Sequence, residues 1–155
     1  MRTILLVEDD ELTRTIADNY LSSDYRVIPY ETATRAIQDL NSYVDGLDLA
    51  IIDVVYNDFR SGVDVWRKLR NKGFMGPVIF FTGITPESRD YKQALFCLNT
   101  DRNNRRFCTI VHKPQTIEGL REAVKQALSD YSNKHRTKIV KIEQIQKHRS
   151  MTNGY

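Results

Sequence analysis

Short apolar runs alternate with segments of helical periodicity along the first 130 residues. The runs are four to seven residues long and predict strands over 3–7, 25–30, 47–52, 78–82 and 107–111. Between them, apolar residues recur at spacings of three and four, which is typical of helices that pack on a sheet. This alternation indicates βαβ units and therefore an α/β domain around a parallel sheet.

Five helices are expected between and after these strands. Capping residues and helix-starting residues place their beginnings at or near Asp10, Thr32 or Thr34, Gly62, Pro86 and Thr116. In the first helix, the apolar residues at helical spacing are Leu12, Ile16, Tyr20 and Leu21. The third helix is expected to stop at Asn71-Lys72-Gly73.

The segment between the fourth and fifth predicted strands is longer than one helix and two short loops require. The surplus falls in Asn99–Arg106, a polar stretch that contains Arg102, Arg105 and Arg106. A solvated loop or a longer helix accounts for it, and a partner-binding or anion-attracting insertion is the alternative.

Residues with useful chemistry follow the C-terminal ends of four predicted strands. The strand ends lead into Glu8-Asp9-Asp10-Glu11, Asp53, Thr82 and, shortly after 107–111, Lys113-Pro114. The ends of parallel strands share one edge of the sheet, where open α/β sheets bind their ligands. We therefore expect an acidic cluster, a hydroxyl group and a lysine on that edge.

The charge of the chain is uneven. Residues 131–155 contain six Lys and Arg but one Glu, a net charge of +5, which leaves −2 for residues 1–130 out of the total of +3. The basic character therefore belongs to the C-terminal extension. The nearly neutral domain gives no electrostatic argument for binding nucleic acid.

Composition favours a soluble protein in a reducing compartment. No stretch approaches the roughly 18 apolar residues of a membrane helix, and the apolar start runs at once into four acids, unlike a signal peptide. Cys97 and Cys108 have no metal-binding spacing and form no disulfide framework. We expect a cytoplasmic location without a membrane partner.

Four motifs in order resemble the receiver domain of two-component response regulators, of the chemotaxis-regulator type. They are Val7-Glu8-Asp9-Asp10, Asp53, Phe81-Thr82-Gly83 and Lys113-Pro114. Each motif alone is weak, whereas the ordered set, each at a strand end, is specific. The resemblance covers residues 1 to about 130. It implies a flavodoxin-like, doubly wound sheet of five parallel strands in the order 2-1-3-4-5, followed by a helical or partly disordered extension over 131–155.

The resemblance also implies a phosphorylation site. Asp53 is the expected phosphoacceptor, and Mg²⁺ is expected on Asp9, Asp53, the backbone carbonyl of Val55 and, through water, Glu8. Thr82 and Lys113 are expected to bind the phosphoryl oxygens, and the cation offsets the repulsion between phosphoryl group and carboxylates. Asp10 and Glu11 are assigned to the helix start instead.

Some positions depart from the family. Ile110 replaces a usually aromatic switch residue, and the loop after Asp53 is one residue longer than usual and lacks a common proline. Val55 and Ile84 flank the expected path of the hydrolytic water, so together with Ile110 they are candidate switch or lifetime modulators. The family usually has a cis peptide at Lys113-Pro114. His112 and His135 have no accompanying nucleophile motif and are interpreted as structural.

These features predict a phosphorylation-dependent signalling protein. A histidine kinase or phosphotransfer protein is the expected donor, the downstream protein target is unknown, and no catalysis beyond Mg²⁺-dependent self-phosphorylation and autodephosphorylation is implied. The alternatives are a phosphorylation-independent pseudo-receiver and the receiver part of a longer transcriptional regulator. An aspartyl phosphatase is disfavoured because Val55 stands where that family has a second Asp.

The basic extension has its own set of interpretations. Residues at spacings of four and three continue the fifth helix beyond the domain, namely Val124, Leu128, Tyr131, His135, Lys138, Ile142 and Ile145. A solvated or frayed helix, a homodimer or partner-docking helix, and a nucleic-acid or membrane-surface contact are the options. The extension is too short for a helix-turn-helix, so no sequence-specific DNA binding is expected.

Overall fold

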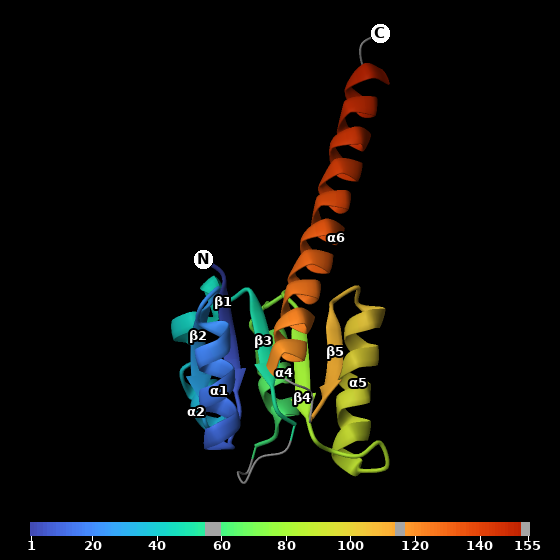
Figure 1. Ribbon diagram of the computed structural model, residues 1–155. Coiled ribbons are helices and arrows are strands. Elements are labelled where there is room, and N and C mark those ends of the chain that lie inside the picture. Colours follow the sequence, from blue (N-terminus) through green and yellow to red (C-terminus); the bar gives the residue numbers. More distant parts are fainter. Residues whose placement is uncertain (55–59, 114–116, 153–155) are drawn as a thin grey trace.

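A computed structural model of the chain describes residues 1–54, 60–113 and 117–152, without the side chains of 135–140 and 152. Its centre is a five-stranded parallel sheet in the order β2-β1-β3-β4-β5 (Figure 1). The strands are β1 (Thr3–Val7), β2 (Arg26–Tyr30), β3 (Leu49–Ile52), β4 (Val78–Thr82) and β5 (Cys108–His112). The predicted α/β fold and strand order are confirmed.

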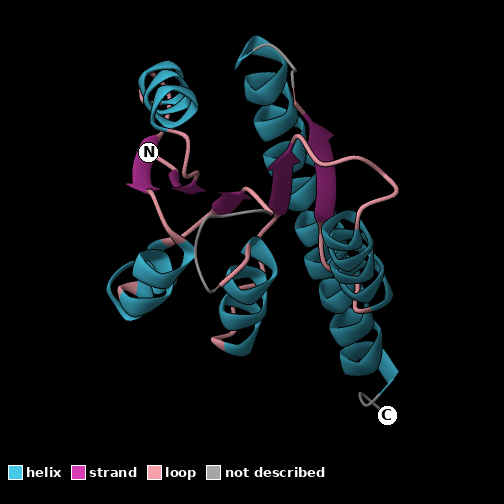
Figure 2. Ribbon diagram, turned by 90° about the horizontal axis from the view of Figure 1, so that it is seen from below, coloured by secondary structure: helices cyan, strands magenta, loops and turns pink. Residues whose placement is uncertain are grey.

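Helices cover both faces of the sheet (Figure 2). They are α1 (Glu11–Leu21), α2 (Ala33–Gln38), α3 (Leu40–Tyr43), the 3₁₀ turn η1 (Val44–Gly46), α4 (Gly62–Asn71), α5 (Arg89–Asn103) and α6 (Ile117–Thr152). One apolar core joins α1 and α6 to the sheet, and a second lies under α2–α5. This is the doubly wound arrangement.

Alternation along the strands divides the two cores. On β1, Ile4 and Leu6 face α1 and α6, whereas Leu5 and Val7 face the opposite layer. Strands β3 and β4 are buried along their whole length, as expected for inner strands of a parallel sheet. Pro29, which has no backbone N–H, lies in the edge strand β2.

Caps define the helix starts, with one correction. The Thr13 amide donates to Asp10 Oδ2 at 2.8 Å and the Arg35 amide to Thr32 Oγ1 at 3.1 Å, so Asp10 and Thr32 are N-caps. The prediction that α5 begins near Pro86 was wrong. Ser88 accepts a hydrogen bond from the Tyr91 amide at 3.1 Å, which places the first helical residue at Arg89.

The apolar face of α1 was also misassigned. Of the four residues expected there, only Leu21 is buried, together with Ala17. Leu12, Ile16 and Tyr20 are 69%, 43% and 38% exposed. The helix packs on the sheet through Ala17 and Leu21. Leu12, Ile16 and Tyr20 therefore lie on its outer side.

The polar stretch 99–106 is mainly helical. Residues 99–103 complete α5, and Arg105 follows with a φ of 58°, the left-handed conformation common just past a helix end. The longer helix, one of the expected options, is therefore correct for this part.

A buried polar network near this helix end was not foreseen. Asp101 is fully buried and accepts from Trp66 Nε1 and Arg70 Nη2, both at 2.8 Å. Arg70 Nη1 donates to the carbonyls of Phe74 at 2.9 Å and Gly76 at 2.8 Å. The network joins α4, the C-terminal end of α5 and the chain entering β4.

Helix α6 continues far beyond the sheet, away from the edge where the strands end (Figure 1). Its first turns are buried through Leu120, Val124, Ala127 and Leu128, and Arg2 Nη2 donates to Ser132 Oγ at 3.1 Å. Farther out, Ile142 and Ile145 are 46% and 55% exposed. The expected helical extension is confirmed. None of the helices in the described ranges is long and apolar enough to cross a membrane.

Candidate functional site

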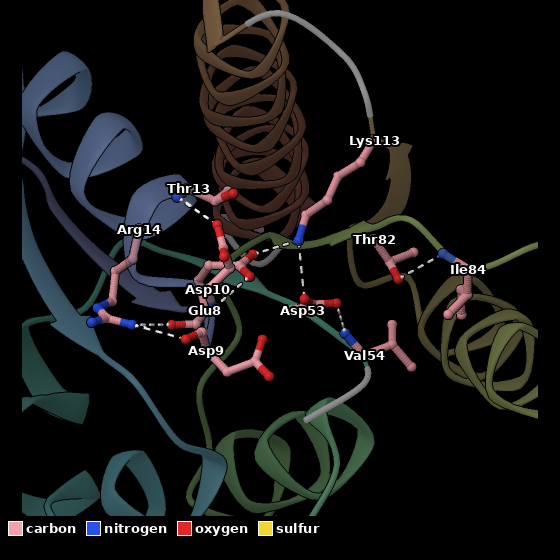
Figure 3. Close-up of polar contacts among 10 residues, drawn as sticks. All are labelled: Glu8, Asp9, Asp10, Thr13, Arg14, Asp53, Val54, Thr82, Ile84 and Lys113. Atoms are coloured by element: carbon pink, nitrogen blue, oxygen red, sulfur yellow. Dashed lines mark hydrogen bonds and ion pairs between the residues drawn. The ribbon is translucent and has the colours of Figure 1, made fainter. Parts of the chain in front are cut away.

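The predicted site residues gather at the C-terminal edge of the sheet (Figure 3). The Asp53 amide donates to the carbonyl of Val7 at 2.9 Å, which holds Asp53 beside the end of β1. The Lys113 amide donates to the carbonyl of Thr82 at 2.8 Å, which ties the end of β5 to that of β4. Parallel register therefore brings together residues that are more than 100 positions apart.

Three carboxylates form the acidic part of the site. One oxygen from each of Glu8, Asp9 and Asp53 lies within 4.8 Å of the others. Glu8 and Asp53 are only 2% and 7% exposed. Backbone amides orient both, because Asp10 N donates to Glu8 Oε1 at 3.2 Å and Val54 N to Asp53 Oδ1 at 2.7 Å.

Lys113 bridges two of these acids. Its Nζ lies 2.6 Å from Glu8 Oε2 and 3.0 Å from Asp53 Oδ2, and 5.2 Å from the centre of the Phe81 ring. Burial lowers the pKa of Lys113, but its hydrogen bonds and charge contacts with Glu8 and Asp53 outweigh burial and raise the pKa overall. The ammonium therefore remains charged.

Glu8 is the carboxylate with a strongly shifted pKa. Burial raises its pKa from 4.5 to about 7, and the charge of Asp53 adds to the shift, although the hydrogen bond from Lys113 opposes it. The contacts with Lys113 do not offset the combined effect of burial and of the Asp53 charge on this pKa. The cluster therefore favours a further positive charge.

Thr82 and Ile84 lie beside the acids at the end of β4. Thr82 is fully buried, and the Ile84 amide lies 3.4 Å from Thr82 Oγ1. Ile84 and Ile110 are partly buried against the core under α2–α5. The switch or lifetime roles of these two residues remain predictions, and Val55 and the Lys113-Pro114 peptide lie outside the described residues.

Three features of the site were missed from the sequence. Gly62 approaches Asp53 so closely that an added Cβ would lie 2.0 Å from the Asp53 carbonyl oxygen. Arg14 Nη1 donates to the carbonyl of Glu8 at 2.8 Å. The rings of Tyr91 and His112 stack with centroids 5.6 Å apart and join α5 to β5. Gly62 at a helix start after Asp53 was a usable signal, whereas the other two contacts depend on packing.

The donor set fits Mg²⁺. The three clustered groups offer only carboxylate oxygens, the ligands that this hard cation prefers, and two of them are buried. When all three are ionised, their charge of −3 against one lysine makes a divalent cation electrostatically favourable. Soft metals would require thiolate or imidazole ligands, which this cluster lacks among the described residues.

The class of protein follows from comparison with known proteins. Residues 4–125 match the family described as the response regulator receiver domain. The chain therefore belongs to the response regulator receiver domain family, which is part of two-component signalling.

Individual relatives agree with this assignment. A CheY-like response regulator receiver domain protein from Methanospirillum hungatei JF-1 has a TM-score of 0.70 and 18% identity, covering 86% of this chain and 98% of that one. The response regulator TrrA from Thermotoga maritima, solved in complex with Mg²⁺-BeF, has a TM-score of 0.62 and 23% identity, covering 82% and 99%. At these identities the likeness shows the fold.

One curated relative is a much longer protein. A cyclic di-GMP phosphodiesterase from Thermotoga maritima is 28% identical over 127 residues, which are 81% of this chain and 31% of the relative. The chain therefore spans about a third of the length of that relative.

Proposed function

We propose that this receiver domain accepts a phosphoryl group on Asp53 from a histidine kinase or phosphotransfer protein and thereby changes its binding to a protein target. The observation that carries the proposal is the position of Asp53. Its carboxylate is nearly buried, lies within 4.8 Å of Glu8 and Asp9, and contacts Lys113 Nζ at 3.0 Å. These are the groups that a phosphoryl transfer to a carboxylate requires.

The transfer is a displacement at phosphorus. An Asp53 carboxylate oxygen forms the new P–O bond while the bond from phosphorus to the donor breaks, and the donor leaves with that electron pair. Lys113 Nζ would donate to one phosphoryl oxygen, and the Thr82 hydroxyl would donate to another. Both groups stabilise the negative charge that spreads over the transferred oxygens.

Mg²⁺ is part of the proposal. Glu8, Asp9 and Asp53 would hold it, with Glu8 acting through water and the Val55 carbonyl as a further ligand implied by the family. The ion would supply the positive charge that lets a phosphoryl group approach three carboxylates. The Mg²⁺-BeF complex of the related TrrA supports this assignment.

The phosphodiesterase activity named for the longer relative is not carried over. The matched residues account for 31% of that protein, and the carboxylate cluster of this chain is explained by phosphoryl acceptance. The proposal is a switch rather than an enzyme with a separate substrate.

Labelling with acetyl phosphate and Mg²⁺ tests the chemistry. We expect one acid-stable, base-labile acyl phosphate per chain, detected by intact-protein mass, and none in Asp53→Asn or after chelation of the metal. Asp45→Asn is the matched control, since Asp45 is exposed and belongs to η1, before β3, away from the carboxylate cluster. Equal labelling of Asp53→Asn and wild type contradicts the proposal.

A further inference from the structure

A groove separates the N-terminal halves of α4 and α5, on the opposite side of the sheet from α1 and α6. Its volume is about 540 Å³. The lining side chains that matter for recognition are Val63, Asp64 and Arg67 from α4 and Arg89, Lys92 and Phe96 from α5. None of them belongs to the phosphorylation site.

The rim of the groove is cationic. Arg67 is paired with Asp64 at 3.2 Å, and Asp64 also accepts from the Ser61 amide at 2.8 Å, so the single acid is already satisfied. Arg89 and Lys92 are exposed, and neither has an ion-pair partner among the residues that the structure describes. Three cations against one anion leave a local charge of +2.

An exposed aromatic ring adjoins these cations. Phe96 is 65% exposed, whereas Val63 on the facing helix is 6% exposed. Lys92 and Phe96 are four residues apart on α5 and therefore lie on one face of the helix. An acidic segment with one apolar anchor complements this combination, because carboxylates can pair with the rim while the anchor covers Phe96 and Val63.

Both walls of the groove are connected to the site around Asp53. The Gly62 amide donates to the Val54 carbonyl at 3.1 Å, and Gly62 packs directly on the Asp53 carbonyl. The chain reaches α5 from Thr82 through Ile84, whose amide faces Thr82 Oγ1. The opposite ends of the helices are held together by Arg70 and Asp101. A change beside Asp53 therefore acts on the open end of the groove while its far end stays anchored.

We propose that this groove binds a partner protein through an acidic segment that carries an apolar anchor, and that the state of Asp53 sets the affinity. The location and chemistry of the binding site stand on the groove itself. Only the dependence on Asp53 rests on the function proposed above.

The probe is a fluorescein-labelled helical peptide of about 16 residues, roughly 24 Å long, with one leucine flanked by glutamates on the same face of the helix. A matched peptide carries glutamine in place of every glutamate. Anisotropy gives the affinity, and amide resonances of the ¹⁵N-labelled full chain give the location. We expect the acidic peptide, but not the glutamine peptide, to bind and to shift the amide resonances of Lys92 and Phe96.

Charge-reversal variants distinguish the groove from the basic extension. Arg89→Glu/Lys92→Glu is expected to weaken binding about tenfold or more, equivalent to at least ~1.4 kcal/mol, and Phe96→Ala should also weaken it. Lys141→Glu/Lys147→Glu, the same charge change on exposed positions of α6, should change it little. Circular dichroism checks that each variant is folded.

Several results overturn the inference. In the affinity measurements, these are peptide binding that survives Arg89→Glu/Lys92→Glu, loss of binding only in the α6 variant, and equal binding of the glutamine peptide. In the spectra, they are an absence of shifts for groove residues and shifts that inorganic phosphate alone reproduces. If the groove resonances shift with protein concentration in the absence of peptide, the groove binds a second copy of the chain instead. Adding beryllofluoride and Mg²⁺ tests the coupling separately, because peptide binding that is unaffected by them removes only the dependence on Asp53.

Discussion

At the scale of single residues, the environment of Glu8 changes the chemistry of an ordinary carboxylic acid. Burial raises its pKa from 4.5 to about 7. Between these two values the folded protein binds a proton that the unfolded chain releases. Stability of the metal-free protein must therefore decrease as the pH rises through this window.

The first prediction at this scale concerns that pH dependence. The free energy of unfolding without metal, measured by urea denaturation, should fall as the pH rises from 4.5 to about 7, the two pKa values of Glu8. Glu8→Gln has no titrating group at this position and should flatten the decline. Saturating Mg²⁺ should also reduce it, because the ion binds the folded state with Glu8 ionised.

Glu122→Gln is the control for this experiment. Glu122 is an exposed acid on α6 that lies 3.8 Å from Lys125, so its removal should leave the slope unchanged. A decline that is identical in wild type and Glu8→Gln would show that another group titrates.

At the scale of elements, α1 presents an apolar face directly after the acids of β1. Leu12 and Ile16 are 69% and 43% exposed, and contiguous exposed apolar side chains often mark contact sites for other proteins. The face is close in the chain to Glu8 and Asp9. We therefore expect this face to be the docking surface for the phosphodonor protein of the function proposed above.

Leu12→Ser/Ile16→Ser should slow phosphorylation by a histidine kinase that phosphorylates the wild-type domain. We expect a loss of about tenfold in kcat/KM, equivalent to ~1.4 kcal/mol, with unchanged labelling by acetyl phosphate. The matched control is Ile142→Ser/Ile145→Ser, since these residues of α6 are similarly exposed at 46% and 55%. Equal slowing with both donors would mean that α1 affects the chemistry rather than docking.

The contact between α4 and α5 depends on one buried charge pair. Asp101→Ala leaves Arg70 without its carboxylate at a position where the side chain is only 5% exposed. We expect a loss of about 3–5 kcal/mol in the free energy of unfolding, measured by chemical denaturation.

Glu122→Ala is the comparison for this prediction. It removes a pair whose side chains are 55% and 67% exposed, and its cost should stay below about 1 kcal/mol. If both substitutions cost the same, the network between α4 and α5 contributes no more than a surface ion pair.

At the scale of the whole molecule, α6 both closes one core and extends beyond it. The helix has 36 residues and is therefore about 54 Å long. Among the side chains of α6 that the structure describes, the last buried one is Leu128, and Tyr131 is half-buried. The interruption of the apolar stripe by His135 and Lys138 disfavours a coiled coil.

Truncation after Tyr131 tests the extension. We expect an unchanged melting temperature within a few degrees and the same monomeric mass by light scattering before and after truncation, because the removed residues contribute little to the core. A full chain with twice the mass would instead identify the extension as a dimerisation helix. Loss of partner or nucleic-acid binding on truncation would show that its charge of +5 is used in recognition.

The main elements and the acidic edge could be predicted from the sequence. Thr82 ends a buried apolar strand, and Glu8, Asp53 and Lys113 each directly follow a strand. Parallel strands place such ends together whatever the details of packing. The helix starts at Asp10 and Thr32 were predicted correctly because each depends on a local hydrogen bond, in which the capping side chain and the amide are three residues apart. These features depend on near neighbours or on a general rule of topology.

The tertiary structure alone decided the remaining features. Helical spacing placed Leu12 and Ile16 on an apolar face, but the packing of Ala17 and Leu21 against the sheet determined which face of α1 is buried. Trp66 and Asp101 are 35 positions apart, and no local pattern pairs them. The groove between α4 and α5 likewise arises from residues that only the packing of helices on the sheet brings together. The raised pKa of Glu8 depends first on its burial, which only the folded chain provides.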